Sequence, residues 1–217
     1  MDALRSLTAS LNDELEGLER DFESLAEYIP VEQEHAALLA LQELKQAVSE
    51  LSEMSERRLL IEGELEQRTY QVTELLARLD EIISTQTDIA RVRVTAAIAD
   101  LVESDDAVRR EGLDRLADVD FFAFDRHVEL GASMDRAGIL MLRMADMAQK
   151  DDLDAARSEV ERSLDLASRR VSYFPSPKAQ ELSREFLDDL NAEIEPGGGF
   201  DLMSSYIDLL AETDVVL

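Results

Sequence analysis

The feature that most limits the fold of this chain is the absence of proline between Pro30 and Pro175. Inside a helix, proline costs about 3 kcal/mol and glycine about 1 kcal/mol. The same stretch holds few glycines and is rich in Leu, Ala, Glu and Arg. We therefore expect a few very long helices and no strands, and the predicted fold class is all-α.

The spacing of apolar residues predicts where the first helices lie. A series with steps of three and four residues predicts a first helix that ends near Pro30: Leu4, Leu7, Leu11, Leu15, Leu18, Phe22 and Leu25. A second series predicts one helix over residues 31–104: Leu38, Leu41, Leu44, Val48, Leu51, Leu65, Val72, Leu75, Leu79, Ile82, Ile89, Ile98 and Leu101. Its register shifts between Met54 and Ile61, where we expect the neighbouring helices to change.

The lengths of these two helices predict the architecture. A helix over residues 31–104 would be about 110 Å long, whereas the first helix would reach only about 40 Å. Because the short helix cannot cover the long one, we expect two stacked, up-down four-helix-bundle-like modules that share the long helix. Residues 1–60 would contribute to one module and residues 61–217 to the other, within a single helical region. A mechanism that transmits signals would lie at the register shift.

The remaining helices are predicted from capping residues and helix breakers. A polar capping residue or an acidic pair opens each of the next helices, and the Pro-Gly-Gly-Gly sequence at 196–199 separates the last two. We expect the final helix to be truncated at Leu217. The expected ranges are 104–116, 118–149, 151–171, 176–194 and 200–217, with a capping Ser176 before Pro177 and an acidic pair, Asp151 and Asp152.

Charge and cysteine content exclude several classes of function. The formal net charge is −27, so nucleic acids and anionic lipid surfaces would be repelled. The chain has no cysteine, which excludes disulfides, thiolate metal sites and cysteine nucleophiles. No apolar run approaches the ~20 residues that span a bilayer. Any attachment to a membrane would use helices outside this sequence.

Neither histidine predicts a metal site or catalytic chemistry. Glu32 and His35 form one Glu-x-x-His step, but a di-iron bundle needs two such steps, and Phe124 stands three residues before His127. We expect both histidines to be solvated on helix faces. The chain also lacks the glycine-rich phosphate loop and the Gly-x-Ser-x-Gly motif. The sequence therefore predicts no metal, no cofactor and no enzymatic activity.

One stripe of small residues is the candidate site for helix packing or signalling. Gly131, Gly138 and Ala145 recur every seven residues along the predicted helix 118–149, on the same seam as Phe121, Phe124 and Val128. The stripe indicates close helix packing, or a recess that a ligand or a sliding neighbour could use. Four methionines near the stripe would be flexible core filling: Met134, Met141, Met144 and Met147.

Residues 96–147 resemble the periplasmic sensor domain of TorS-like sensor histidine kinases, which act in trimethylamine N-oxide respiration. The likeness lies in Ile98-Ala99-Asp100-Leu101-Val102-Glu103, in Leu113-Asp114-Arg115-Leu116-Ala117-Asp118-Val119-Asp120, and in the distance from there to Glu129-Leu130. More weakly, it extends over residues 30–190. The resemblance implies two stacked helical bundles, held as a parallel homodimer between membrane helices, that dock a periplasmic ligand-binding protein. It supplies no catalytic motif.

The sequence interpretation is an extracytoplasmic sensor domain of a membrane-bound two-component sensor histidine kinase, in the periplasmic portion of an inner-membrane protein. It would detect a ligand directly or through a periplasmic binding protein and relay the signal by helix movement. One alternative is the sensor domain of a chemoreceptor. Another is a structural coiled-coil interaction protein, for which Met1 would be the native start. Flanking membrane helices and a downstream kinase or methylated hairpin would distinguish the three.

Overall fold

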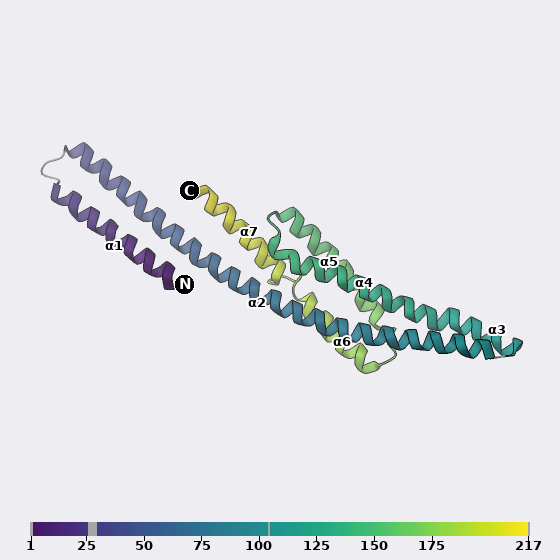
Figure 1. The fold of residues 1–217 in the computed structure, drawn as a ribbon. Helices are drawn as coiled ribbons and strands as arrows, with labels where there is room; N and C mark the ends of the chain where they lie inside the picture. Colours follow the sequence, from purple (N-terminus) through teal and green to yellow (C-terminus); the bar gives the residue numbers. More distant parts are fainter. Residues whose placement is uncertain (1, 26–29, 104, 217) are drawn as a thin grey trace. The chain divides into compact units, whose positions relative to one another are not determined.

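The computed structural model describes residues 2–25, 30–103 and 105–216, and the regular elements in these ranges are all helical (Figure 1). The all-α prediction is confirmed. Among the described residues, no helix has the length and apolar character needed to cross a bilayer.

In chain order the elements are α1 (Asp2–Leu25), α2 (Val31–Glu103), α3 (Asp106–Arg115), the π-helix η2 (Leu116–Phe121), α4 (Phe122–Arg143), the 3-10 helix η3 (Met144–Asp146), α5 (Lys150–Val171), α6 (Pro177–Asn191) and α7 (Gly199–Val216).

The chain divides into two compact units. Unit 1 comprises Met1–Glu64 and Ser205–Leu217, and unit 2 comprises Leu65–Ser204. The divisions fall inside α2 and inside α7. The sequence interpretation placed one boundary near residue 60 and assigned all of residues 61–217 to the second module, whereas Ser205–Leu217 lie with unit 1.

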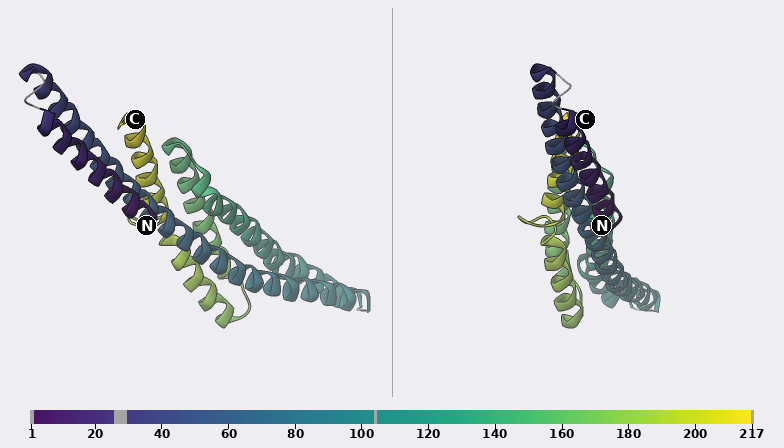
Figure 2. Two further views of the ribbon diagram at one scale, coloured as in Figure 1. Left: turned by 60° about the vertical axis from the view of Figure 1, so that its left-hand side comes forward. Right: turned by 90° about the vertical axis from the view of Figure 1, so that its left-hand side faces the viewer.

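Unit 1 is thinly packed. Helix α1 runs beside the first part of α2 in every view (Figures 1 and 2), and a hydrogen bond of 3.0 Å joins Thr8 Oγ1 to Ser52 Oγ. Within the predicted α1 seam Leu15 is buried, but three other members are largely exposed: Leu7, Leu11 and Leu18. The apolar series predicted the helix itself, and only part of the series is buried, because a single neighbouring helix covers only part of the stripe.

Unit 2 holds the larger core. Helix α4 packs along α5, and α5 packs along α6. Side chains with almost no exposed surface come from each of these helices and from the second part of α2: Leu79, Leu130, Val160, Leu164, Leu187 and Leu190. The turn between α5 and α6 adds Phe174, which is 2% exposed. The burial of these apolar side chains provides most of the stabilisation of the unit.

The buried stripe of α2 differs from the predicted series in its second half. The predicted members Leu65, Val72 and Leu79 are buried, but Ile89 and Ile98 are exposed. The observed stripe continues instead through Ile83, Gln86, Ala90 and Val94. Both stripes have helical spacing. The stripe that is buried is the one that faces α4, where Gly131 lies against Ile83.

Helix boundaries follow the capping signals only in part. The amide of Ala179 donates to Ser176 Oγ at 3.3 Å, so the predicted cap of α6 is confirmed. Asp151 and Asp152 lie in the first turn of α5 and are not its cap, which is Gln149. The break predicted near residue 117 is absent, since η2 joins α3 to α4. Helices α4 and α6 end at Arg143 and Asn191, earlier than predicted.

Candidate functional site

The predicted stripe of small residues is only partly a packing seam. Gly138 is buried, and a Cβ atom there would lie 3.1 Å from Leu76 Cδ1 of α2. At Gly131 a Cβ atom would lie 3.7 Å from Ile83 Cγ2, an ordinary van der Waals contact. Ala145 is exposed in η3, after α4 has ended. The structure therefore brings Gly131 and Gly138 against α2 and leaves Ala145 outside the seam.

These contacts predict a graded result for alanine substitutions. Gly63→Ala should raise the free energy of unfolding by about 1 kcal/mol, because glycine costs that much in a helix interior and nothing lies within 4 Å of the added methyl group. Gly131→Ala should also stabilise. Gly138→Ala should give a change near zero or a loss, because Leu76 must move to admit the methyl group. Urea denaturation measures all three, and equal gains at Gly63 and Gly138 would contradict the close packing.

A buried histidine forms the centre of a polar corner that the sequence interpretation missed. His127 is 1% exposed, so its expected place on a solvated face is wrong. Its Nε2 donates to the carbonyl oxygen of Tyr173 at 3.2 Å. Its ring packs edge-on against Phe174, with 5.0 Å between the ring centroids. His127 therefore fastens α4 to the turn between α5 and α6.

Charged and aromatic groups surround this corner. Glu129 accepts a hydrogen bond from Arg126 Nη1 at 2.5 Å and lies 2.7 Å from Arg170 Nε of α5. The Arg126 hydrogen bond, followed by the charges of Arg126 and Arg170, holds the pKa of Glu129 below its usual value. The Arg126 guanidinium lies 4.6 Å from the centre of the Phe122 ring, which packs edge-on against Tyr173. These contacts join α4 to α5 over the buried imidazole.

The burial of His127 predicts a dependence of stability on pH. Burial lowers the pKa of His127, as does the charge of Arg93, while backbone hydrogen bonds to Tyr173 and Gln86 raise it. The net shift is downward, so the unfolded chain binds more protons than the folded chain just below pH 6.5. Stability that is present above pH 6.5 is lost as the pH falls toward the folded pKa, with a slope of up to about 1.4 kcal/mol per pH unit.

The measurement is a series of urea denaturations between pH 5 and pH 8. The 49 acidic residues also titrate, so the informative quantity is the difference between the wild type and His127→Gln, whose side chain does not titrate. We expect the wild type to lose stability relative to His127→Gln below about pH 6.5. The exposed His35, changed to Gln, is the control. Parallel curves for the wild type and His127→Gln would contradict the inferred burial of a neutral imidazole.

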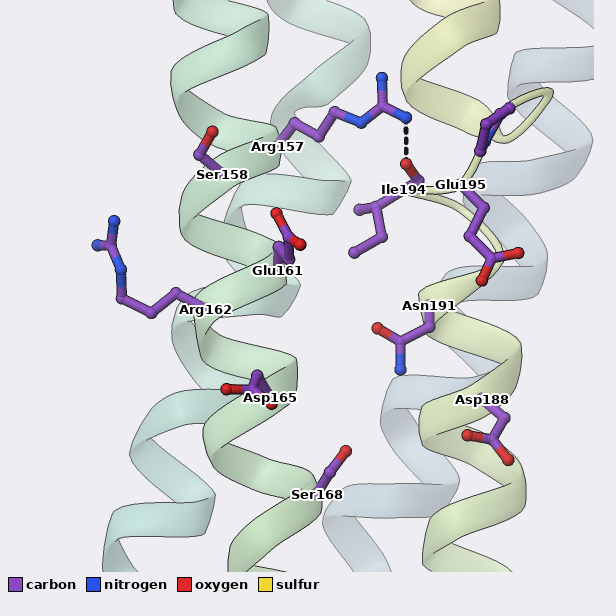
Figure 3. A pocket seen from close by; sticks show the side chains of 11 residues that line it. Arg157, Ser158, Glu161, Arg162, Asp165, Ser168, Asp188, Asn191, Ile194 and Glu195 are labelled. Carbon is purple, nitrogen blue, oxygen red and sulfur yellow. Dashed lines mark hydrogen bonds between the residues drawn. The ribbon is translucent and has the colours of Figure 1, made fainter.

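A polar groove of about 1000 Å³ lies between α5 and α6 in unit 2 (Figure 3). Its two arginines are engaged: Arg157 Nη1 contacts Asp201 Oδ1 at 2.7 Å and Nη2 donates to the Ile194 carbonyl, whereas Arg162 pairs with Glu159. Four carboxylates also line it, so the groove is not suited to an anion. They are Glu161, Asp165, Asp188 and Glu195.

The described part of the chain contains no cluster of His, Cys, Asp or Glu side chains suited to a metal ion. Glu32 and His35 are both exposed on the first turns of α2. The structure instead brings Gly131 and Gly138 of α4 against α2, and His127 of α4 against the α5–α6 turn. Proximity of His127 to Tyr173 could not be found from sequence spacing, since 46 residues separate them.

Comparisons with known proteins identify the fold. No family model matches the chain, and no curated protein matches it. The structure is similar to the TorS sensor domain in the crystal structure of the TorS sensor domain–TorT complex in the presence of TMAO, with a TM-score of 0.83 and 18% identity. The match covers 96% of this chain and 78% of that one. The chain therefore has the fold of a TorS-like sensor domain.

Proposed function

We propose that this chain is the extracytoplasmic sensor region of a membrane-bound sensor histidine kinase. The observation that carries the proposal is the fold, which is similar over 96% of the chain to a sensor domain crystallised with TorT. The neighbour shares only 18% of its residues, so the likeness supports the type of module and does not identify a ligand. Periplasmic location and anchoring by flanking membrane helices are part of the proposal.

The partner in this proposal is a periplasmic ligand-binding protein. The neighbouring structure contains such an arrangement, a sensor domain with a second protein. Here the groove between α5 and α6 is open and polar, and both its arginines already have carboxylate partners. A separate protein that captures the ligand and docks on the helices would remove the need for a ligand pocket in this chain. A homodimer of the parent receptor would present two such surfaces.

The relay in this proposal is a movement of packed helices. Packed seams have discrete arrangements, so a ligand or partner can shift the population between them. The contact between Gly138 and Leu76 allows α4 to approach α2 closely. Gly131, Gly138 and Ala145 therefore stay candidate signalling positions, although Ala145 can act only through η3.

The test is a binding titration between this chain and the periplasmic ligand-binding proteins encoded near its gene. Each protein is titrated calorimetrically with and without its ligand. We expect one of them to form a stoichiometric complex whose affinity depends on the ligand. If none binds, and a small molecule instead raises the melting temperature of the chain, direct sensing replaces the partner, as in the chemoreceptor alternative.

The sequence of the parent gene distinguishes a histidine kinase from a chemoreceptor and from a structural coiled-coil protein. A histidine kinase parent would have a membrane helix on each side of this region and ATP-binding motifs downstream. A chemoreceptor would have a long methylated hairpin in place of the kinase motifs. An open reading frame that encodes residues 1–217 alone would support the structural coiled-coil alternative and would contradict the sensor proposal.

A further inference from the structure

A second groove of unit 2, with a volume of about 650 Å³, lies between the end of α2 and the segment formed by α3 and η2. Helix α3 lies beside the end of α2 (Figure 1). Arg109 Nε of α3 donates to the carbonyl oxygen of Leu101 at 3.1 Å, which ties α3 to the last turn of α2. Gly112 allows this close approach, since a Cβ atom there would lie 2.5 Å from Leu101 Cδ2. Contacts within the chain therefore hold the two walls of the groove together.

Much of the groove is lined by small and apolar side chains: Ala96, Ala97, Leu101, Val108 and Val119. Val108 and Val119 are 59% and 56% exposed, so a bound group that covered them would remove apolar surface from water. The volume is within the range of about 300–1000 Å³ that small-molecule sites occupy. The walls of the groove therefore suit a short apolar chain.

Two arginines line the same groove, Arg93 from α2 and Arg115 from α3. Within the described part of the chain, neither guanidinium has a hydrogen bond or an ion pair. This is unusual here, because acidic residues outnumber basic ones by 49 to 22. Many other arginines do have a carboxylate partner: Arg58, Arg68, Arg78, Arg91, Arg126, Arg136, Arg157, Arg162, Arg169 and Arg170.

The charges around these two arginines favour an anionic group. Asp100 and Asp120 also line the groove, but Asp100 already interacts with another residue of the chain. The two guanidiniums therefore outnumber the remaining carboxylate. The net charge of the whole chain acts weakly at this site, since charges beyond about 8 Å are screened at physiological ionic strength. A planar guanidinium can donate two parallel hydrogen bonds to one carboxylate.

We propose that this groove is a binding site for an organic carboxylate that carries a short apolar chain. Arg93 and Arg115 donate to the carboxylate oxygens, and the apolar chain lies against Ala97 and Val119. The carboxylate belongs either to a free small molecule or to the protein that docks on this chain. Only the second source rests on the proposed function, because the site itself is formed within unit 2.

The experiment titrates the chain of 217 residues with sodium butyrate and follows its backbone amide signals by nuclear magnetic resonance. Butyramide, which has nearly the same shape and no charge, is the matched control ligand. Sodium chloride keeps the ionic strength constant. We expect butyrate to cause saturable shifts of the Gly112 and Arg115 amide signals, and butyramide to cause none. Equal binding of the two ligands, or shifts that do not saturate with butyrate, would overturn the site.

Arginine variants test which side chains bind the carboxylate. Arg93→Gln and Arg115→Gln should each weaken butyrate binding by about tenfold, because each removes a charged donor. Arg143→Gln is the matched control, since Arg143 is exposed in the last turn of α4 and does not line the groove. We expect its affinity for butyrate to equal that of the wild type. Equal affinities in the wild type and all three variants, or equal losses in all three, would overturn the site.

A second titration identifies the source of the carboxylate. The binding protein of the proposed function is titrated into the wild type and Arg93→Gln, with and without butyrate. If the partner supplies the carboxylate, butyrate competes with it and Arg93→Gln weakens the complex by about tenfold. A complex that is insensitive to both changes assigns the site to a free carboxylate. If no partner binds, the proposed docking fails, whereas the butyrate titration still decides whether the site exists.

Discussion

Phe174→Ala should lower the free energy of unfolding by about 3–5 kcal/mol, the usual cost of removing a buried aromatic ring. Phe174 is 2% exposed and packs edge-on against His127. Its carbonyl oxygen accepts a hydrogen bond from Gln180 Nε2 at 2.7 Å, which ties the turn to α6. The alanine variant keeps this backbone contact and loses the ring, so the expected loss reports packing at the corner.

The neighbouring tyrosine provides a matched control. Tyr173 is 39% exposed, and its ring makes one edge-on contact with Phe122 at 5.5 Å. Tyr173→Ala keeps the carbonyl oxygen that His127 contacts, so we expect a loss of only about 0.5–1.5 kcal/mol. Urea denaturation of both variants gives the comparison. Equal losses would mean that Phe174 does not form part of the core of unit 2.

Gly198→Ala should be the other severely destabilising substitution, with an expected loss of about 3 kcal/mol. A Cβ atom at Gly198 would lie 2.4 Å from the backbone oxygens of Ala192 and Glu193. The clash is with backbone, so no side-chain rotation can relieve it. The turn between α6 and α7 would have to open, which would disturb the hydrogen bond of 3.2 Å from Phe200 N to Glu193 O.

Gly197→Ala separates this steric effect from backbone strain. Gly197 has φ +84°, yet nothing lies within 4 Å of a Cβ atom placed there. Alanine at this position should cost only the roughly 1–2 kcal/mol of a left-handed conformation. The two variants are compared by urea denaturation. A loss for Gly198→Ala no larger than that for Gly197→Ala would show that the turn is looser than these contacts indicate.

Local signals predicted much of this fold because they act over a few residues. The lack of proline gave the full extent of α2, and Ser176 before Pro177 gave the start of α6. The π-helix η2 was missed because a π turn needs only a different hydrogen-bonding partner in the same helical sequence. Residues 116–121 contain no glycine or proline that would mark it.

Contacts between distant segments were the part that the sequence could not predict. Helix α2 carries two apolar stripes at helical spacing, and burial of Ile83 rather than Ile89 depends on where α4 packs. His127 is buried because the α5–α6 turn covers it. The bond between Tyr206 and Glu62 joins residues 144 positions apart. No local pattern of residue types encodes these pairings.

The central proposal is that binding of a periplasmic partner to this chain moves its helices, and one measurement tests it most directly. The chain has no native cysteine, so spin labels are introduced at two exposed positions of unit 1, Glu43→Cys on α2 and Glu212→Cys on α7. Pulsed electron paramagnetic resonance records the distance between them for this chain alone and with the proposed periplasmic binding protein, with and without ligand. The account predicts that ligand-dependent binding shifts the distance distribution away from that of the free chain. A complex that forms fully and leaves the distribution unchanged would contradict it.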